Sequence, residues 1–161
     1  MGKQATQTIV RVVLDTNVFI FGYSEGEGVE VEKQILQRLS NNPRFVLLLS
    51  VELEDQILRV AKRVRDKDWA GLLRYLLWSD FNVEFVLLPS FESLQPLHRE
   101  AMETIPRKDR LIFLTALLGN ADYLVSTNRA FVKSAAEKQN LFKCVTPEEF
   151  LRVVLSDADS V

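Results

Sequence analysis

The sequence predicts an α/β fold, a three-layer α/β/α sandwich in which helices cover both faces of a mainly parallel five-stranded sheet. Five short apolar runs, rich in valine and leucine, alternate along the chain with segments whose apolar residues recur at helical spacing. Strands that are separated by helices pair in parallel, and both faces of such a sheet need helical cover. We expect the 161 residues to form a single domain, 1–161, with its core at about 9–154 and a frayed tail at 156–161.

The first half of the chain contains two of the expected strands and three helices. Strand 9–14 is β-branched and ends at polar residues, and strand 44–49 reads RFVLLL after the breaker sequence NNP. A helix is expected between them at 28–40, and it ends at the same NNP. Helices 51–65 and 68–80 each have an apolar stripe at helical spacing. The stripes consist of Leu53, Ile57, Val60 and Val64, and of Trp69, Leu72, Leu73, Leu76 and Leu77.

The second half continues the alternation of strands and helices. Strand 81–88 is followed by a loop that Pro89 opens and by a short helix near 92–103. Residues 109–118 are nearly all apolar, so that helix must be buried. The remaining elements, each bounded by polar or turn-forming residues, are strand 122–126, helix 128–138, strand 141–145 and a final helix from Pro147.

The composition is that of a soluble globular protein, with 47% hydrophobic residues, 26% charged residues and a formal net charge of −2. A nucleic-acid partner must therefore meet a local basic patch. The single cysteine, Cys144, excludes an intramolecular disulfide and favours a reducing cytosol. We see no signal-peptide pattern and no apolar run long enough for a bilayer, so a cytoplasmic protein without a membrane partner is expected.

Polar side chains follow the carboxyl ends of the expected strands. Because the strand-to-helix turns of a parallel sheet lie on one edge, we expect these side chains to converge there. In chain order, they are Asp15 and Asn17; Glu52, Asp55 and Gln56; Asp109; and Thr127 and Asn128. Each also has a local explanation, such as Asp15 capping a helix that begins near Val18. Carboxylates brought together repel one another, so their convergence indicates a divalent cation among them.

Other kinds of catalytic site lack the residues that they need. Position 17 is asparagine, whereas a phosphotransferase of the haloacid dehalogenase type needs a second aspartate there. The turn after the first strand has no glycine-rich phosphate loop. His98 is the single histidine, so serine and cysteine nucleophiles lack a base, and one histidine with one cysteine does not favour a zinc site.

Three stretches of the sequence form a recognisable set: VVLDTNVFI at the start, PRKDRLIFLTAL two-thirds along the chain and ADYLVSTNRAF near the end. Together they resemble the PIN domain family of metal-dependent ribonucleases, and the resemblance runs over about 9–154. It implies the same α/β/α sandwich and an acidic site that binds Mg²⁺ or Mn²⁺ and activates a water against an RNA phosphodiester. Many members are toxins of toxin–antitoxin pairs, so the resemblance implies RNA as one partner and an antitoxin protein as another.

Matched position by position, the resemblance assigns Asp15 and Asp109 as metal-binding and catalytic residues. Other acidic positions of the family are occupied differently, the final acid by Asn128, the helical glutamate by Gln56 and an occasional third acid by Pro106. Amide side chains offer a carbonyl oxygen but no charge, so each replacement weakens divalent binding. We therefore expect weak binding of the cation, at millimolar concentration or with an RNA phosphate completing its coordination.

Helix geometry points to Glu52 as a replacement third carboxylate. It lies four residues before Gln56 on the same edge of the expected helix, one turn nearer the carboxyl end of the sheet. An ordinary first-turn glutamate, favoured by the helix dipole, is the alternative. Asp55 points away from the apolar stripe and is expected to be exposed to solvent. Asn17 and Thr127 are expected to orient the carboxylates.

Two basic groups are suited to contact RNA. Arg107, Lys108 and Arg110 surround Asp109, where they can meet a phosphate at the site. The segment 59–68, RVAKRVRDKD, begins on the helix of the expected site. It is either a track for the RNA backbone or an ordinary solvated helix face.

The sequence leaves two functions open: a metal-dependent endoribonuclease, and a non-catalytic PIN-like module that binds RNA or a protein. The reason for the second is the presence of Gln56 and Asn128 at acidic positions. The helix from Trp69 to Trp78 has more apolar surface than one face of a sheet needs. Core burial and a homodimer contact both explain this surface.

Overall fold

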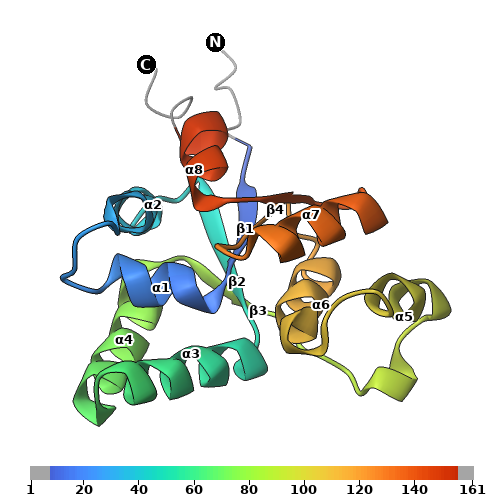
Figure 1. Cartoon of the computed structure of the whole chain (residues 1–161), viewed down its shortest axis with the longest axis horizontal. Coiled ribbons are helices and arrows are strands. Elements are labelled where there is room, and N and C mark those ends of the chain that lie inside the picture. The colour runs from blue at the N-terminus through green and yellow to red at the C-terminus, as the bar shows by residue number, and fades with distance from the viewer. Residues whose placement is uncertain (1–7, 156–161) are drawn as a thin grey trace, which may run out of the picture.

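The structure is a computed structural model, and it describes residues 8–155 of the chain (Figure 1). Five parallel strands form one sheet in the order β3-β2-β1-β4-β5, which confirms the expected fold class. The strands are β1 (Val10–Leu14), β2 (Phe45–Leu49), β3 (Val83–Phe85), β4 (Tyr123–Val125) and β5 (Lys143–Val145). The tail expected at 156–161 lies outside the described residues.

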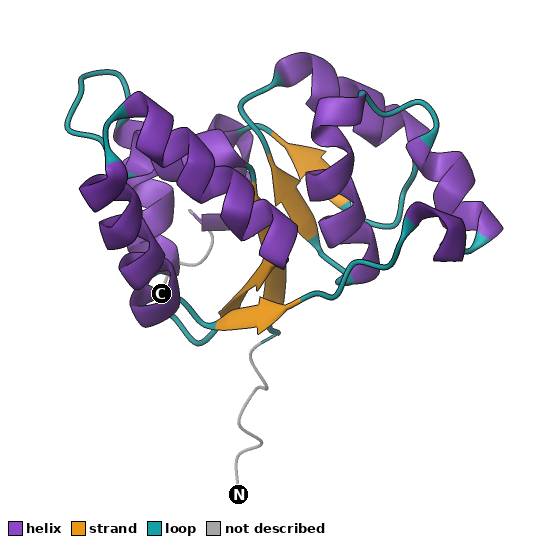
Figure 2. Cartoon of the chain, turned by 90° about the horizontal axis from the view of Figure 1, so that it is seen from below, coloured by secondary structure: helices purple, strands orange, loops and turns teal. Residues whose placement is uncertain are grey.

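Helices lie on both sides of the sheet (Figure 2). One group consists of α1 (Thr16–Gly22), α2 (Glu30–Leu39), α3 (Val51–Val64) and α4 (Lys67–Asp80). The other consists of α5 (Pro96–Met102), α6 (Arg110–Leu118) and α7 (Arg129–Lys138). The last helix, α8 (Pro147–Phe150), continues as a π-helical turn over Leu151–Leu155 and contacts α2.

The direction of the crossover connections explains why the helices occupy two sides. The chain steps from β1 to β2 and then to β3 in one direction, returns past β1 to β4, and continues to β5 in the other. Right-handed crossovers that run in opposite directions place their helices on opposite faces of the sheet. The carboxyl ends of β1 and β4 therefore lie side by side where the direction reverses, which is where open α/β sheets bind ligands.

The structure corrects three details of the expected elements. The strand expected at 81–88 is much shorter, because β3 lies at the edge of the sheet and pairs only with β2. The buried stripe of α3 ends at Ala61, and Val64 is exposed. On α4, Leu72 is exposed, so the buried side of this helix is narrower than expected. Asp55 is exposed, as expected from its position on the helix.

The helix α6 is the buried centre of its layer, as the apolar run at 109–118 indicated. Its residues from Ile112 to Leu117 are all buried, and the helix contacts β1, β2 and β4. One buried polar contact joins it to the start of α3, where Ser50 Oγ and Thr115 Oγ1 lie 2.9 Å apart. In the part of the chain that the structure describes, no helix has the length and apolar character needed to cross a membrane.

Gly119 ends α6 where this helix meets the sheet. A Cβ at this position would lie 2.8 Å from the Thr115 carbonyl oxygen and 2.8 Å from Val86 Cγ2. We expect Gly119→Ala to lower the free energy of unfolding by about 1–3 kcal/mol in urea denaturation, because the packed backbone cannot move aside. In the control Gly26→Ala, the added Cβ meets nothing within 4 Å, and a change below about 0.5 kcal/mol is expected. Equal urea midpoints for the two variants would contradict this account of the packing.

Candidate active site

The end of β1 places Asp15 beside the end of β4. In the register of these strands Leu14 stands opposite Val125, and the Asp15 N–H donates to the Val125 carbonyl at 2.9 Å. Asp15 is also the N-cap of α1, where its Oδ1 accepts a hydrogen bond from the Thr16 N–H at 2.6 Å. The residue thus caps a helix and also lies on the sheet edge at the point where the crossover direction reverses.

Ser126 supplies a second hydrogen bond to Asp15. Its Oγ donates to Asp15 Oδ2 at 2.6 Å and accepts a hydrogen bond from the Asn128 N–H at 3.1 Å. Ser126 is fully buried, so water does not compete for this contact. The two carboxylate oxygens of Asp15 are therefore held in one orientation by the first residue of α1 and the first residue after β4.

The residues expected to orient Asp15 were a different pair. Asn17 is exposed and Thr127 is half-buried, whereas the hydrogen bonds that Asp15 accepts come from Ser126 and Thr16. The order and register of the strands could have identified Ser126 as the partner of Asp15. The residue directly after β4 must stand next to the residue directly after β1, because the two strands are neighbours that end together.

Asp109 reaches the same region from the start of α6. It ends the 3₁₀ turn Arg107–Asp109, and its side chain makes no capping hydrogen bond. The residue is only 7% exposed, and its buried Oδ2 has no hydrogen-bond partner among residues 8–155. A buried carboxylate oxygen without a partner destabilises the folded state, so this atom needs a proton or a cation.

The charges of Asp15 and Asp109 act on one another. Burial raises the pKa of the Asp15 carboxyl, while the hydrogen bonds from Ser126 and Thr16 and the charge of Lys108 oppose this shift. Burial also raises the pKa of Asp109, the charge of Asp15 raises it further, and Lys108 again opposes the shift. The two carboxylates are therefore within electrostatic reach, and positive charge placed between them would relieve their repulsion.

A third carboxylate does not complete this pair. Among the described residues, no three His, Cys, Asp or Glu side chains are grouped so that they could hold a metal ion. Glu52 and Gln56 are half-buried on the first turns of α3. Glu52 was proposed as the third carboxylate, but it does not form a group of three with Asp15 and Asp109. Its position in the first helical turn agrees instead with the alternative explanation, a glutamate favoured by the helix dipole.

Asn128 caps α7 and supports the hydrogen bonds around Asp15. Its Oδ1 accepts a hydrogen bond from the Phe131 N–H at 3.2 Å, and its own N–H donates to Ser126. The carbonyl oxygen that was expected to face a cation is thus engaged at the start of a helix. Asn128 is connected to Asp15 through Ser126.

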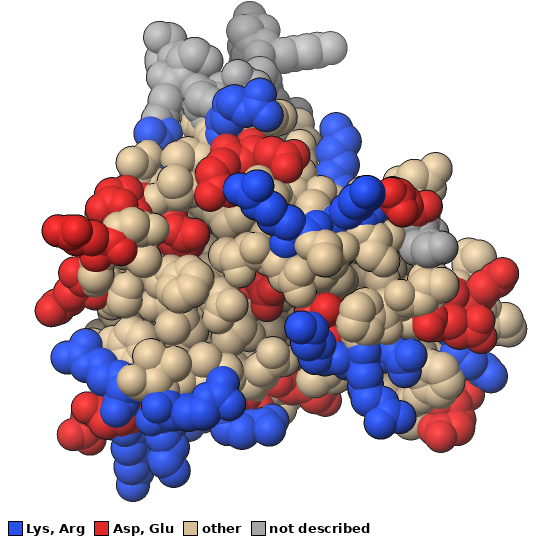
Figure 3. Space-filling model, viewed as in Figure 1, with Lys and Arg blue, Asp and Glu red and all other residues tan. Residues whose placement is uncertain are grey.

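The basic residues around Asp109 differ in what they are free to bind. Arg110 Nε donates to the Ile105 carbonyl at 3.1 Å, so this guanidinium is tied to the preceding loop. Arg107 and Lys108 are exposed. Figure 3 shows basic side chains next to acidic ones near the middle of this face of the molecule. Arg107 and Lys108 are therefore better placed than Arg110 to meet a phosphate.

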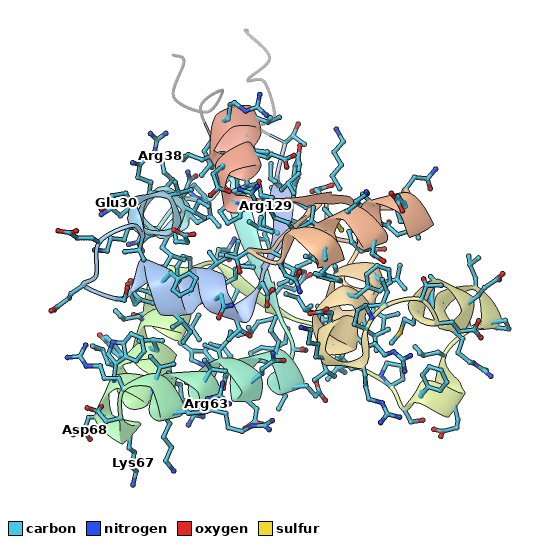
Figure 4. All side chains as sticks on the ribbon, viewed as in Figure 1. Glu30, Arg38, Arg63, Lys67, Asp68 and Arg129 are labelled. Carbon is cyan, nitrogen blue, oxygen red and sulfur yellow. The ribbon has the colours of Figure 1, made fainter. Side chains whose placement is uncertain are left out.

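A second basic group extends over the end of α3 and the start of α4. Arg59 pairs with Asp55 at 2.6 Å, and Arg65 lies over the ring of Trp69 at 5.7 Å from its centroid. The exposed cations of this group also include Lys62, Arg63 and Lys67. Figure 4 shows Arg63 and Lys67 projecting away from the two helices, and Figure 3 shows basic side chains along this edge of the same face.

The donor atoms of the site fit a hard divalent cation. Carboxylate oxygens are preferred ligands of Mg²⁺ and Mn²⁺, and the unpartnered Oδ2 of Asp109 lies within the electrostatic reach of Asp15. With two carboxylates rather than three or four, the site has little negative charge for holding such an ion. The site therefore offers the oxygen ligands that such a cation prefers, but only two negative charges to hold it.

Comparison with known proteins identifies a family by sequence and a similar fold among solved structures. The sequence matches the family model described as PIN domain over residues 12–137. Among solved structures, the chain is similar to one in the crystal structure of VapBC2 from Rickettsia felis bound to a DNA fragment from their promoter. The TM-score is 0.57 and the identity 15%, over 85% of this chain and 98% of the other, so the similarity concerns the fold. A search of curated proteins found no match.

Ser126→Ala tests the support of Asp15. The hydrogen bond from Ser126 favours the charged form of the Asp15 carboxylate, and the variant lacks it. We therefore expect the pKa of Asp15 to rise further and the free energy of unfolding at neutral pH to fall by about 1–2 kcal/mol. Carboxyl-carbon NMR titration measures the first and urea denaturation the second. Thr127→Ala is the matched control and should leave the pKa of Asp15 in place. An Asp15 pKa that does not respond to Ser126→Ala would disprove this role.

Asp109→Asn tests the repulsion between the two carboxyls. Because the pKa of Asp109 in the folded state is raised above 3.8, its contribution to stability is fully present below that pH and is lost as pH rises through the raised value. We expect the variant to match the wild type near pH 4 without divalent ions, and to exceed its stability by about 1 kcal/mol at pH 7. Urea denaturation at both pH values measures this difference. A variant less stable than the wild type at pH 7 would contradict the repulsion.

Proposed function

Because the chain belongs to the PIN domain family, we propose that it is a metal-dependent endoribonuclease in which Asp15 and Asp109 hold a Mg²⁺ or Mn²⁺ ion. The observation that supports this most directly is the buried Oδ2 of Asp109. It lacks a hydrogen bond and belongs to a carboxyl whose pKa is raised by the charge of Asp15. Protein groups that repel one another in this way are stabilised by a cation.

The residues around this pair have distinct parts in the proposed reaction. A bound divalent cation would lower the pKa of the attacking water and neutralise charge on the phosphate. Ser126 holds the Asp15 carboxylate in a fixed orientation, so little reorganisation is needed when substrate binds. Lys108 and Arg107 are exposed beside Asp109 and would bind phosphate oxygens next to the scissile bond.

RNA would be bound mainly through its backbone. Lys62, Arg63 and Lys67 are exposed at the end of α3 and the start of α4, and Arg63 and Lys67 project away from these helices (Figure 4). Phosphate contacts of this kind give affinity without reading sequence. Any contact of Glu52 and Gln56 with the cation would be through water, because the described residues contain no three-carboxylate cluster that could bind the ion directly. We therefore propose weak divalent binding that improves when an RNA phosphate is present.

We further propose that the protein is the cytoplasmic toxin of a toxin–antitoxin pair and has an antitoxin partner. The similarity in fold to the Rickettsia felis VapBC2 structure supports this assignment. It can be examined separately from catalysis, because a short reading frame should lie directly upstream of the gene. A solitary gene would count against an antitoxin and leave the nuclease proposal unaffected.

A second candidate function is a non-catalytic module that binds RNA or a protein. Two observations favour it: no third carboxylate joins Asp15 and Asp109 among residues 8–155, and Asn128 uses its side-chain oxygen to cap α7. Such a module would retain the basic surfaces and would not need a cation. The two functions therefore differ in their response to divalent ions.

Divalent ions should stabilise the protein through Asp15. At about ten times its dissociation constant, Mn²⁺ should add about 1.4 kcal/mol to the free energy of unfolding, a rise in Tm of roughly 3–5 °C. Asp15→Asn should lose this rise together with Mn²⁺-dependent cleavage of single-stranded RNA. Asp55→Asn, an exposed carboxylate on α3, should keep both. Mn²⁺ stabilisation that persists in Asp15→Asn would place the cation elsewhere.

Asn128→Asp distinguishes the enzyme from the binding module. Aspartate can accept the same hydrogen bond from the Phe131 N–H, so the cap of α7 is kept while one negative charge is added near the site. For the enzyme, we expect calorimetry to show at least a severalfold tighter Mn²⁺ affinity, with faster cleavage. For the module, the added charge would lower stability without creating cleavage. Unchanged affinity, stability and cleavage would contradict both functions.

A further inference from the structure

A cavity of about 470 Å³ lies beside β5, the last strand on its side of the sheet. This strand pairs only with β4, and both α7 and α8 contact it (Figure 1). The cavity is lined by side chains from α7, from β5 and from the start of α8. Its volume is in the range of sites that hold small ligands, and none of its lining residues has a part in the proposed cation site.

The cavity is close to the acidic site along the carboxyl edge of the sheet. Arg129, which lines it, directly follows Asn128, whose N–H donates to Ser126. Ser126 in turn donates its N–H to the Val145 carbonyl of β5 at 3.1 Å and its hydroxyl to Asp15. Because β4 lies between β1 and β5, the two sites are separated by two strand spacings, about 10 Å. Neighbouring nucleotides of one RNA strand can therefore occupy both.

One face of α7 supplies the basic part of the lining. Arg129, Val132, Lys133 and Ala136 all line the cavity, and they recur at the spacing of a single helix face. The cations of Arg129 and Lys133 are exposed one turn apart. Within residues 8–155, neither side chain forms an ion pair or a hydrogen bond. Two such cations are suited to bind a phosphate group.

The start of α8 supplies the acidic part, with two glutamates that differ in their contacts. Glu149 belongs to the cap of the helix: its N–H donates to Thr146 Oγ1, and the Thr146 hydroxyl donates to Glu149 Oε1, both at 3.2 Å. Glu148 is exposed and, among the described residues, has no hydrogen-bond or ion-pair partner. Both oxygens of the Glu148 carboxylate are therefore available to accept hydrogen bonds from a ligand.

The rest of the lining includes uncharged, mostly apolar surface. Val132 and Cys144 each keep 8% of their surface exposed, and Ala136 lies one turn after Val132 on α7. Burial raises the pKa of the Cys144 thiol to about 12, so this group carries no charge at neutral pH. A nucleobase has apolar faces and polar edges, so it can cover this surface while its edge reaches a charged side chain.

From these observations we propose that this cavity, the α7–α8 pocket, binds a guanosine nucleotide of the RNA, an inference that rests on the proposed nuclease. Arg129 and Lys133 bind its phosphate, the base covers Val132 and Cys144, and Glu148 accepts the N1–H and N2–H of guanine. Among the four RNA bases, guanine alone presents two adjacent N–H donors to the two oxygens of a carboxylate. Glu148 thus gives the protein a preference for guanine next to the cleaved bond.

NMR titration of the full chain with guanosine or adenosine 5′-monophosphate in EDTA tests the pocket without cleavage. Guanosine monophosphate should shift the amide signals of Lys133, Cys144 and Glu148, with a Kd lower than that of adenosine monophosphate by about fivefold or more. Glu148→Gln should remove this preference, and Arg129→Gln should weaken both nucleotides. A wild type in which no pocket signals shift, or in which the two nucleotides bind equally, would overturn the proposal.

Two exposed charged residues outside the lining serve as matched controls. Glu137→Gln on α7 and Lys143→Gln on β5 should leave both Kd values unchanged, because neither side chain lines this cavity. Equal urea midpoints for the controls and the pocket variants would show that all of them fold. A loss of the guanine preference in Glu137→Gln as large as in Glu148→Gln would overturn the role of Glu148.

Cleavage assays separate this pocket from the nuclease itself. With Mn²⁺, the pentanucleotide UUGUU should be cleaved with a kcat/KM about fivefold or more above that of UUAUU, and Glu148→Gln should equalise the two. Asp15→Asn should lose cleavage and still bind guanosine monophosphate. Binding without any cleavage in the wild type would support the pocket and contradict the nuclease. Cleavage without a preference for guanine would support the nuclease and overturn the pocket as a site for RNA, even if the free nucleotide binds.

Discussion

The parallel pairing of β1 with β4 determines where the polar side chains of this protein meet. Their neighbouring ends lie where the crossovers reverse direction, so the first residue after each strand is brought together although 111 positions separate Asp15 from Ser126. The same pairing places the starts of α1 and α7 side by side, and the N–H groups there are satisfied by Asp15 and Asn128. The site is thus a consequence of sheet order and helix capping together.

This arrangement concentrates negative charge in a region that is already poor in water. Burial raises the pKa of both aspartates, and the hydrogen bonds that would lower it are unevenly shared: Asp15 accepts two, whereas Asp109 keeps one buried oxygen without a partner. Lys108 compensates part of this charge from the surface. The pair is therefore stable enough to persist in the fold and still favours an additional cation, which is the physical basis of the proposed nuclease.

Much of the fold and part of the site follow from the sequence alone. The alternation of apolar runs with helical patterns predicted the sheet, and the nearly all-apolar segment 109–118 predicted the buried helix α6. Asp15 and Asp109 could be predicted as site residues because strand ends and helix starts are visible in sequence, and their role in binding a cation stays a prediction. Ser126 was missed, because its contact with Asp15 depends on which strands become neighbours. The excess apolar surface of α4 was visible in the sequence, but not which of its residues stay exposed. Glu52 does not form a three-carboxylate group with the two aspartates among the described residues, because helical phase fixes direction around a helix but not the distance to another element.

The central claim is that Asp15 and Asp109 together hold a divalent cation. Anomalous diffraction from crystals soaked in Mn²⁺ tests it most directly, because the anomalous signal locates the ion and the refined structure gives the separation of the carboxyls. The account predicts one Mn²⁺ peak within bonding distance of both carboxylates, which would then lie roughly 4–6 Å apart. A Mn²⁺ peak bound to other residues, or carboxyls more than about 10 Å apart, would contradict it.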